Sequence, residues 1–184
     1  MEDGGDTVVA DVPDNRTPTI LTAGYGDRGF PAFIELLKAH GVTHFVDVRS
    51  VPQSSYWEDF RRPNLQRLVP ETGLRYVWMG DTLGGVPDSP ILCKEPGKVS
   101  LEGLDETPEF RLGLDRLLKA AAGEDRVLCL ICGCKRPHRC HRARLIAPAI
   151  VRAGANVVHI DERGELKDQA IVADEERGFQ PELF

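Results

Sequence analysis

Residues 19–48, TILTAGYGDRGFPAFIELLKAHGVTHFVDV, decide the fold of this chain. Two short apolar runs, at 19–23 and 44–48, predict buried strands, and the segment between them predicts a helix. Pro31 suits the first turn of that helix, its apolar residues recur at helical spacing, and Gly41 ends it. A strand, a helix and a strand in about 30 residues form a βαβ unit, so the sheet begins parallel.

The rest of the chain continues this alternation of strands and helices. Further strands are predicted at 74–78, 126–131 and 156–160. Further helices are predicted at 65–69, 107–121 and 137–153. Pro148 predicts a kink in the last helix, because proline removes one backbone hydrogen bond. The pattern predicts a three-layer, Rossmann-like α/β domain with a mainly parallel sheet of about five strands.

The charged residues divide the chain into three parts. Residues 1–17 and 161–184 are acidic, whereas the intervening residues carry a small net positive charge. We therefore expect a mobile acidic tail at 1–17, a single α/β domain over 18–160 and an acidic C-terminal extension at 161–184. No apolar run approaches the roughly 20 residues of a membrane span, and the first residues lack a signal-peptide pattern. These features predict a cytoplasmic protein without membrane contact.

Three of the five cysteines fall within nine positions, as Cys132, Cys134 and Cys140. The odd count and the crowding argue against a secreted disulfide scaffold and favour reduced thiols. Seven of the ten residues from 135 to 144 are Lys, Arg or His, so positive potential is focused on this loop. A single focused loop of this kind favours an anionic small molecule over a long nucleic-acid track.

The carboxyl ends of the predicted strands collect the unusual residues of this sequence. In open parallel sheets, the ligand crevice lies beyond these ends. The residues concerned are Tyr25 at the first strand, Asp47 and Arg49 at the second, Gly84 and Gly85 after the third, and 132–142 after the fourth. If the strands are parallel, these segments meet at one rim. Asp47 interrupts an apolar strand, so we expect it to bind loop backbone or an arginine.

The cysteine loop predicts the chemistry of this rim. A helix N-terminus beginning at Pro137 and nearby guanidinium groups favour an anion, and the same field stabilises thiolates. The predicted anion-binding residues are Arg49, Arg139 and Arg142. The predicted catalytic residues are a cysteine nucleophile and an acid–base histidine, drawn from Cys132, Cys140 and His141. The predicted supporting residues are Asp47, Tyr25, Gly84, Gly85 and Cys134.

A metal site is an alternative for the same loop. Its four ligands would be Cys132, Cys134, Cys140 and His141. Zinc knuckles prefer cysteine pairs two to four residues apart, and the adjacent Cys140-His141 is awkward for one ion. The principal assignment is therefore a site without metal, and the sequence requires no cofactor.

Several motifs, taken together, resemble a known family. They are Thr22-Ala23-Gly24-Tyr25-Gly26, Val46-Asp47-Val48-Arg49 with Pro52, Leu83-Gly84-Gly85, and Cys132-x7-Cys140-His141-Arg142. In this order they resemble the bacterial and archaeal family called domain of unknown function 488, over about residues 19–160. The resemblance implies an α/β fold with its motifs on one rim and implies no reaction. The chain departs from the family where Tyr25 and Gly26 replace a usual His-Ser, and where Cys134 replaces a common acidic residue.

The leading functional hypothesis is an enzyme that acts on a phosphate-bearing or nucleotide-like anionic ligand through the cysteine loop. Rhodanese-like sulfur transfer is an alternative, since 46–49 resembles the rhodanese strand motif and Cys134 begins a Cys-x4-Arg loop. A nucleic-acid-binding module is another, with phosphate contacts from the basic loop and from Arg61, Arg62 and Arg67, and stacking from Tyr56 and Trp57. The remaining alternatives are a Cys3His metal-binding domain and an interaction domain, both without catalysis.

Overall fold

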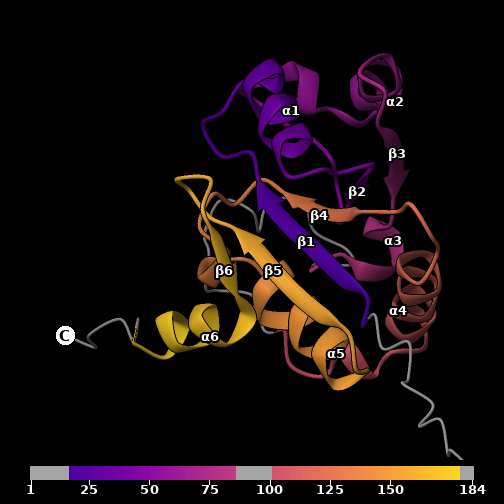
Figure 1. Ribbon diagram of the computed structural model, residues 1–184, viewed down its shortest axis with the longest axis vertical. Helices are drawn as coiled ribbons and strands as arrows, with labels where there is room; N and C mark the ends of the chain where they lie inside the picture. The colour runs from indigo at the N-terminus through magenta and orange to yellow at the C-terminus, as the bar shows by residue number, and fades with distance from the viewer. Residues whose placement is uncertain (1–16, 86–100, 179–184) are drawn as a thin grey trace, which may run out of the picture.

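Six strands form one sheet in the computed structural model, which describes residues 17–85 and 101–178 (Figure 1). They are β1 (Thr19–Gly24), β2 (His44–Asp47), β3 (Arg75–Trp78), β4 (Leu128–Cys132), β5 (Asn156–Ile160) and β6 (Leu166–Asp168). The order in the sheet is β3-β2-β4-β1-β5-β6. β1 to β5 are parallel, whereas β6 pairs antiparallel with β5. The predicted α/β fold is confirmed, with a sixth strand that was not predicted.

Helices cover both faces of the sheet (Figure 1). One face carries α1 (Phe30–Ala39) and α2 (Arg62–Glu71), and the other carries α3 (Gly80–Leu83), α4 (Pro108–Ala121) and α5 (Ala147–Arg152). Strand side chains alternate between the faces, so Leu21 of β1 joins the first core and Ile20 joins the second. The first core is aromatic, with the rings of Tyr25 and Phe60 stacked at 3.9 Å, and the second is mostly aliphatic.

Two predicted helices begin where the sequence indicates. The Thr107 side chain accepts a hydrogen bond from the backbone N–H of Phe110 at 3.2 Å, and this bond caps the start of α4. Helix α2 is longer than the predicted 65–69, because it begins at Arg62 and passes through Pro70. The proline lies in the last turn, where the helix ends one residue later, so its missing N–H does not interrupt a long run of hydrogen bonds.

The helix predicted over 137–153 is wrong in its first half. A 3-10 turn, η4 (Pro137–Arg139), comes first, and a π turn, η5 (Arg142–Ile146), leads into α5. Between the two turns, Cys140 has an extended backbone with φ −117° and ψ 143°. Pro148 is the second residue of α5 and directly follows the π turn, so it removes one backbone N–H where the two turns join. A π turn of this kind often marks a functional site.

The chain continues the fold beyond residue 160. Strand β6 pairs with β5, and helix α6 (Gln169–Gly178) follows, with Val172 buried. Acidic side chains of α6 pair with basic residues of the body, as in Glu176 with Arg144 at 2.6 Å. These elements occupy much of the segment expected as an acidic extension at 161–184. The tail expected at 1–17 lies outside the described residues except for Thr17, as do residues 179–184.

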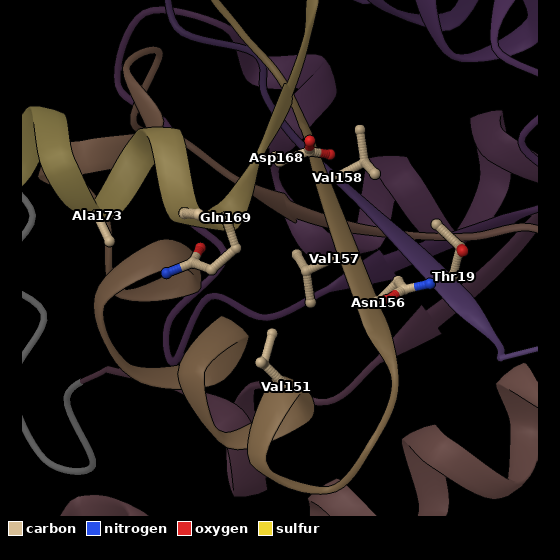
Figure 2. A pocket seen from close by; sticks show the side chains of 9 residues that line it. Thr19, Val151, Asn156, Val157, Val158, Asp168, Gln169 and Ala173 are labelled. Carbon is tan, nitrogen blue, oxygen red and sulfur yellow. The ribbon is translucent and has the colours of Figure 1, made fainter.

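An open groove of about 500 Å³ lies between α5, β5 and the start of α6 (Figure 2). Its walls include Thr19 and Asn156, which begin β1 and β5, and Gln169, which begins α6. The groove is therefore at the amino-terminal ends of these parallel strands, and its lining contains none of the predicted site residues. Among the described helices, none is both long enough and apolar enough to cross a membrane.

Candidate functional site

The segments that follow β1, β2, α3 and β4 meet at one rim of the sheet, as expected. The strands end at the same level, because Gly24 is in register with Cys132 and Asp47 with Ile131. The ring of His141 reaches the backbone after β2, where its Nε2 lies 3.0 Å from the carbonyl oxygen of Val48. Neighbouring elements in the sheet thus place residues that are far apart in the sequence around one point.

Two thiols and one imidazole form the centre of this rim. The sulfur atoms of Cys132 and Cys140 and a ring nitrogen of His141 lie within 4.8 Å of one another. Nδ1 of His141 is 3.8 Å from each of the two sulfurs. A carbonyl only accepts hydrogen bonds, so Nε2 of His141 is the N–H that donates to Val48. A neutral His141 therefore presents the lone pair of Nδ1 to both sulfur atoms.

Cys134 places a third thiol beside this centre. It is half-buried, and its thiol interacts with the thiols of Cys132 and Cys140 but does not belong to the group of three ligand atoms that lie within 4.8 Å of one another. These interactions, with a smaller contribution from burial, raise the pKa of the Cys134 thiol. Cys129 is different, because it is buried in the interior of β4 among apolar side chains, and burial raises its pKa. We name Cys132, Cys134, Cys140 and His141 the cysteine–histidine cluster.

The backbone explains how the adjacent Cys140 and His141 can face one point. Cys140 is extended, whereas His141 has the helical values φ −57° and ψ −26°. In a continuous helix, successive side chains would diverge by about 100°. The break between η4 and η5 removes this divergence. The objection that an adjacent pair is awkward for one ion therefore does not hold in this structure.

The charges around the cluster favour a thiolate at Cys140. Burial alone would raise the pKa of Cys140, but its contacts with the other two thiols and the positive charges of Arg142 and His141 bring that pKa well below the ordinary value. Burial alone would lower the pKa of His141, but the thiolates of Cys132 and Cys140 hold that pKa well above the ordinary value. With no other cation bound, these side chains favour a Cys140 thiolate beside a His141 imidazolium.

Arg49 is held entirely by the protein. Its Nε and Nη2 donate to the two carboxylate oxygens of Asp47 at 2.8 and 2.6 Å, and Nη2 also donates to the carbonyl of Phe60. Nη1 donates to the hydroxyl of Tyr25 at 3.1 Å. Burial would lower the pKa of Arg49, but the Asp47 carboxylate keeps it above the ordinary value. Asp47 therefore binds an arginine, as expected, and most donors of Arg49 are already used.

Arg142 is fully buried and is held by neutral groups. Its Nη1 donates to the carbonyl of Cys134 at 2.6 Å, and its Nη2 points to the carbonyl of Lys135 at 3.4 Å. No ion pair between described residues includes Arg142. A buried charge requires a partner of opposite sign. The thiolate of Cys140 is the negative charge that lies beside it.

The predicted supporting residues Tyr25, Gly84 and Gly85 have mainly packing roles. A Cβ on Gly84 would come within 2.2 Å of the Ser50 hydroxyl, and one on Gly85 within 2.8 Å of the His141 side chain. Burial raises the pKa of Tyr25, whose ring stacks on the aromatic core. Arg139 lies in η4, which is only three residues long. The continuous 137–153 helix on which the predicted anion site was based does not form, and anion binding by this loop stays a prediction.

No site role was assigned from the sequence to three residues near Arg142. Thr22, His159 and Gln169 are linked to it through a series of hydrogen bonds. Thr22 is a polar residue inside an apolar strand and belongs to the 22–26 motif, and His159 is a histidine at the end of a predicted strand. Gln169 lies in the segment expected as an extension, so nothing placed it near the rim.

A comparison with protein families supports the family resemblance of the sequence motifs. A family model described as "Domain of unknown function DUF488" matches residues 30–148. The match begins at α1, includes the whole cysteine loop and ends in the first turn of α5. Neither a curated protein nor a solved structure matches the chain. Because the matched residues are more than half of the chain, the protein belongs to the DUF488 family of domains of unknown function.

Proposed function

We propose that the cysteine–histidine cluster binds a transition-metal ion, with Zn²⁺ as the best match. The observation that carries this proposal is the position of His141 Nδ1, 3.8 Å from the sulfurs of both Cys132 and Cys140. Thiolate and imidazole are the ligands that zinc prefers, and a tetrahedral zinc site separates its sulfur and nitrogen atoms by roughly 3.5 Å. A small contraction of these three atoms would therefore provide three ligand positions around one ion, and the nearby thiol of Cys134 is our candidate for the fourth ligand.

The number and burial of the thiols support chelation over a simple catalytic pair. A cysteine–histidine catalytic pair requires one thiol, whereas here one imidazole faces two sulfurs and a third lies close by. Cys132 is 2% exposed and Cys140 is 0% exposed. Reactive cysteines usually lie in partly exposed positions. A metal would use all three thiols and would not require access for a substrate.

The surroundings of His141 also support metal binding. Its Nε2–H donates to the Val48 carbonyl, which fixes the tautomer and leaves Nδ1 as the ligand atom. Metal-binding histidines commonly donate their second N–H to a carboxylate or carbonyl in this way. Gly85 packs closely against the imidazole ring and limits its rotation. The ring is therefore oriented by the fold before any metal is bound.

Charge balance supports Cys134 as the fourth ligand. Cysteine binds zinc as the thiolate, so three thiolates, one neutral imidazole and Zn²⁺ carry one net negative charge. The buried guanidinium of Arg142 would offset that charge. With two thiolates the centre would be neutral, and Arg142 would have no anionic partner among the described groups. A closed Cys3His centre would fasten the end of β4 to the start of η5.

A second candidate function is the leading hypothesis from the sequence, an enzyme that acts on an anionic small molecule. The favouring observation is that the Cys140 sulfur lies 3.8 Å from His141 Nδ1, beside the buried charge of Arg142. In a protein without metal, Cys140 would be the nucleophile and His141 the acid–base group. Phosphate would then protect the thiol from alkylation.

Metal analysis of the purified protein, produced without a metal-binding tag, separates the two candidates. We expect one equivalent of zinc per chain. After exchange for Co²⁺, we expect intense thiolate-to-cobalt charge-transfer absorption and the visible bands of a tetrahedral ion. Cys132→Ser and Cys140→Ser should lose the metal, whereas Cys129→Ala, a buried cysteine outside the cluster, should retain it. Protein that takes up neither metal and shows one fast, phosphate-protected cysteine would overturn the proposal and favour the enzyme.

A further inference from the structure

A chain of hydrogen bonds connects Arg142 to helix α6. Nε of Arg142 lies 3.2 Å from the hydroxyl of Thr22, which lies 2.7 Å from Nδ1 of His159. Nε2 of His159 lies 2.6 Å from Oε1 of Gln169, whose side chain projects from the start of α6 (Figure 2). Nε2 of Gln169 lies 3.0 Å from the carbonyl of Ala143. The series of hydrogen bonds therefore ends at Ala143, the residue that follows Arg142.

The donor and the acceptor of each hydrogen bond in this series can be assigned from the two groups at its ends, the Ala143 carbonyl and the Nε–H of Arg142. The Ala143 carbonyl only accepts, so the Gln169 amide nitrogen donates to it and the amide oxygen faces His159. His159 must then carry its proton on Nε2, which leaves Nδ1 to accept from the Thr22 hydroxyl. The Thr22 oxygen in turn accepts from Nε–H of Arg142. No donor faces another donor, and each of the three side chains is satisfied.

The imidazole in the chain is held in its neutral form. Burial is the main cause, and together with the charge of Arg142 it lowers the pKa of His159 to about 4, although Gln169 and Glu175 oppose the shift. Near neutral pH the ring therefore keeps one donor nitrogen and one acceptor nitrogen. Both are needed, because Thr22 donates on one side and Gln169 accepts on the other.

The orientation of Arg142 matters to the cluster for two reasons. Its Nη1 holds the carbonyl of Cys134, which is pressed so closely against Gly24 that a Cβ there would come within 1.8 Å of that oxygen. Its positive charge also acts on the thiol of Cys140. A rotated guanidinium would release the loop and remove the counter-charge at the same time.

We infer that Thr22, His159 and Gln169 are positioning residues, which orient Arg142 and through it tune the metal centre. The inference rests on the proposed function. The three residues belong to β1, β5 and α6, and all of them lie outside the matched residues 30–148. The C-terminal helix of this chain is thus part of the machinery around the cysteine loop.

Substitutions at Thr22 test the inference in the zinc-loaded protein. Thr22→Val keeps the shape of the side chain but removes the hydroxyl, whereas Thr22→Ser keeps the hydroxyl. Removing a direct hydrogen-bond partner of a metal ligand typically weakens metal binding by about 10- to 100-fold, and Thr22 acts one step further out, through Arg142. We expect Thr22→Val to weaken zinc binding by about the lower end of that range in chelator competition and to shift the charge-transfer band of the Co²⁺ form. Thr22→Ser should restore the zinc affinity and the Co²⁺ spectrum. Thr19→Val, on the same strand but outside the series of hydrogen bonds, should change neither the affinity nor the spectrum.

Unchanged zinc affinity and an unchanged Co²⁺ spectrum in Thr22→Val would overturn the inference. Gln169→Leu replaces Thr22→Val if that variant does not fold, as judged by near-UV circular dichroism. Hydrogen exchange of peptide 133–141 separates this inference from the proposed function. If the protein binds no metal, the proposed function fails, but Thr22→Val should still speed exchange in that peptide while Thr22→Ser should not. Equal exchange rates in Thr22→Val and the parent protein would overturn the positioning role as well.

Discussion

Arg49 and Arg142 are both buried at the same rim, but their positive charges are balanced in different ways. Arg49 is paired with the carboxylate of Asp47 two residues away, so its charge is neutralised beside its own strand. Arg142 is surrounded by a hydroxyl and by carbonyl groups, which accept its protons without carrying a full negative charge. The first arginine therefore stabilises the fold, whereas the second requires an anion from the neighbouring cluster.

The two arginines also depend on different parts of the chain. The Arg49 pair is joined by Tyr25, Tyr76 and the Phe60 carbonyl, all on the aromatic side of the sheet. Arg142 depends on β1, β5 and α6, on the side of the π turn. Substitutions in the first set of residues should therefore reduce the stability of the fold. Substitutions in the second set should change metal binding by the cysteine–histidine cluster.

The largest effect is expected from Asp47→Asn, which removes the partner of Arg49 and leaves a buried charge uncompensated. Breaking one side of a buried pair typically costs about 3–5 kcal/mol. Urea denaturation should show a loss of this size in the free energy of unfolding. The double variant Asp47→Asn with Arg49→Met should recover part of that loss. A loss below about 1 kcal/mol in the single variant would contradict the role assigned to the pair.

Metal removal is expected to have the next largest effect, because it acts on the charge that balances Arg142. A ligand that binds only the folded state adds about 3 kcal/mol when its free concentration is 100 times the dissociation constant. Thermal unfolding should therefore occur at a lower temperature after treatment with a strong chelator, and the original temperature should return with added zinc. Cys140→Ser should have the lower temperature from the start, with no response to chelator. An identical response in both proteins would place the metal elsewhere.

The pH dependence of stability should reveal His159. Its folded pKa of about 4 lies below the ordinary value of 6.5, so the unfolded chain binds more protons between those values. Stability should therefore fall as the pH falls through that window, by about 2 kcal/mol between pH 7 and pH 5. His159→Asn has no such proton to bind, so the fall should be smaller by that amount. Parallel curves for the two proteins would contradict the neutral, buried state of this ring.

The smallest effect is expected from an ion pair on the surface. Asp115 and Lys119 lie 2.7 Å apart on α4, with exposed fractions of 55% and 76%. Solvent screens such pairs, so Asp115→Asn should change the free energy of unfolding by roughly 0.5 kcal/mol or less. A urea titration beside that of Asp47→Asn gives the scale for the buried pair. A loss as large as that of Asp47→Asn would show that burial is not what makes the Arg49 pair important.

Periodicity and turn residues were sufficient to predict most of the fold. The apolar runs of β1, β2 and β4 and the helical spacing of α1 and α4 each indicate one local structure. The meeting of the strand ends followed from parallel topology alone. The acidic α6 was not predicted, because its stability depends on ion pairs with the body, such as Glu176 with Arg144. Those partners are invisible in a linear sequence.

The location of the candidate site at the rim of the sheet was predicted, but the geometry of its side chains was not. Leu145, Ile146, Ala149 and Ile150 do have helical spacing, yet the residues before them bend to bring Cys140 and His141 to one point. The burial of the two arginines also differs from what their positions in the sequence suggest. A charged residue after a strand suggests an exposed ligand contact, whereas Arg49 and Arg142 donate their hydrogen bonds to acceptors inside the protein. Burial and backbone breaks arise from tertiary packing, which no local pattern reports.

X-ray absorption at the zinc edge of the purified protein would show whether the cysteine–histidine cluster binds zinc, because it counts the ligand atoms around the metal. The cysteine–histidine cluster predicts three sulfur atoms at about 2.3 Å and one nitrogen atom at about 2.0–2.1 Å from zinc. Cys134→Ala should reduce the sulfur count by one, and Cys129→Ala should leave it unchanged. A protein without bound zinc, or zinc surrounded only by oxygen and nitrogen, would contradict the account.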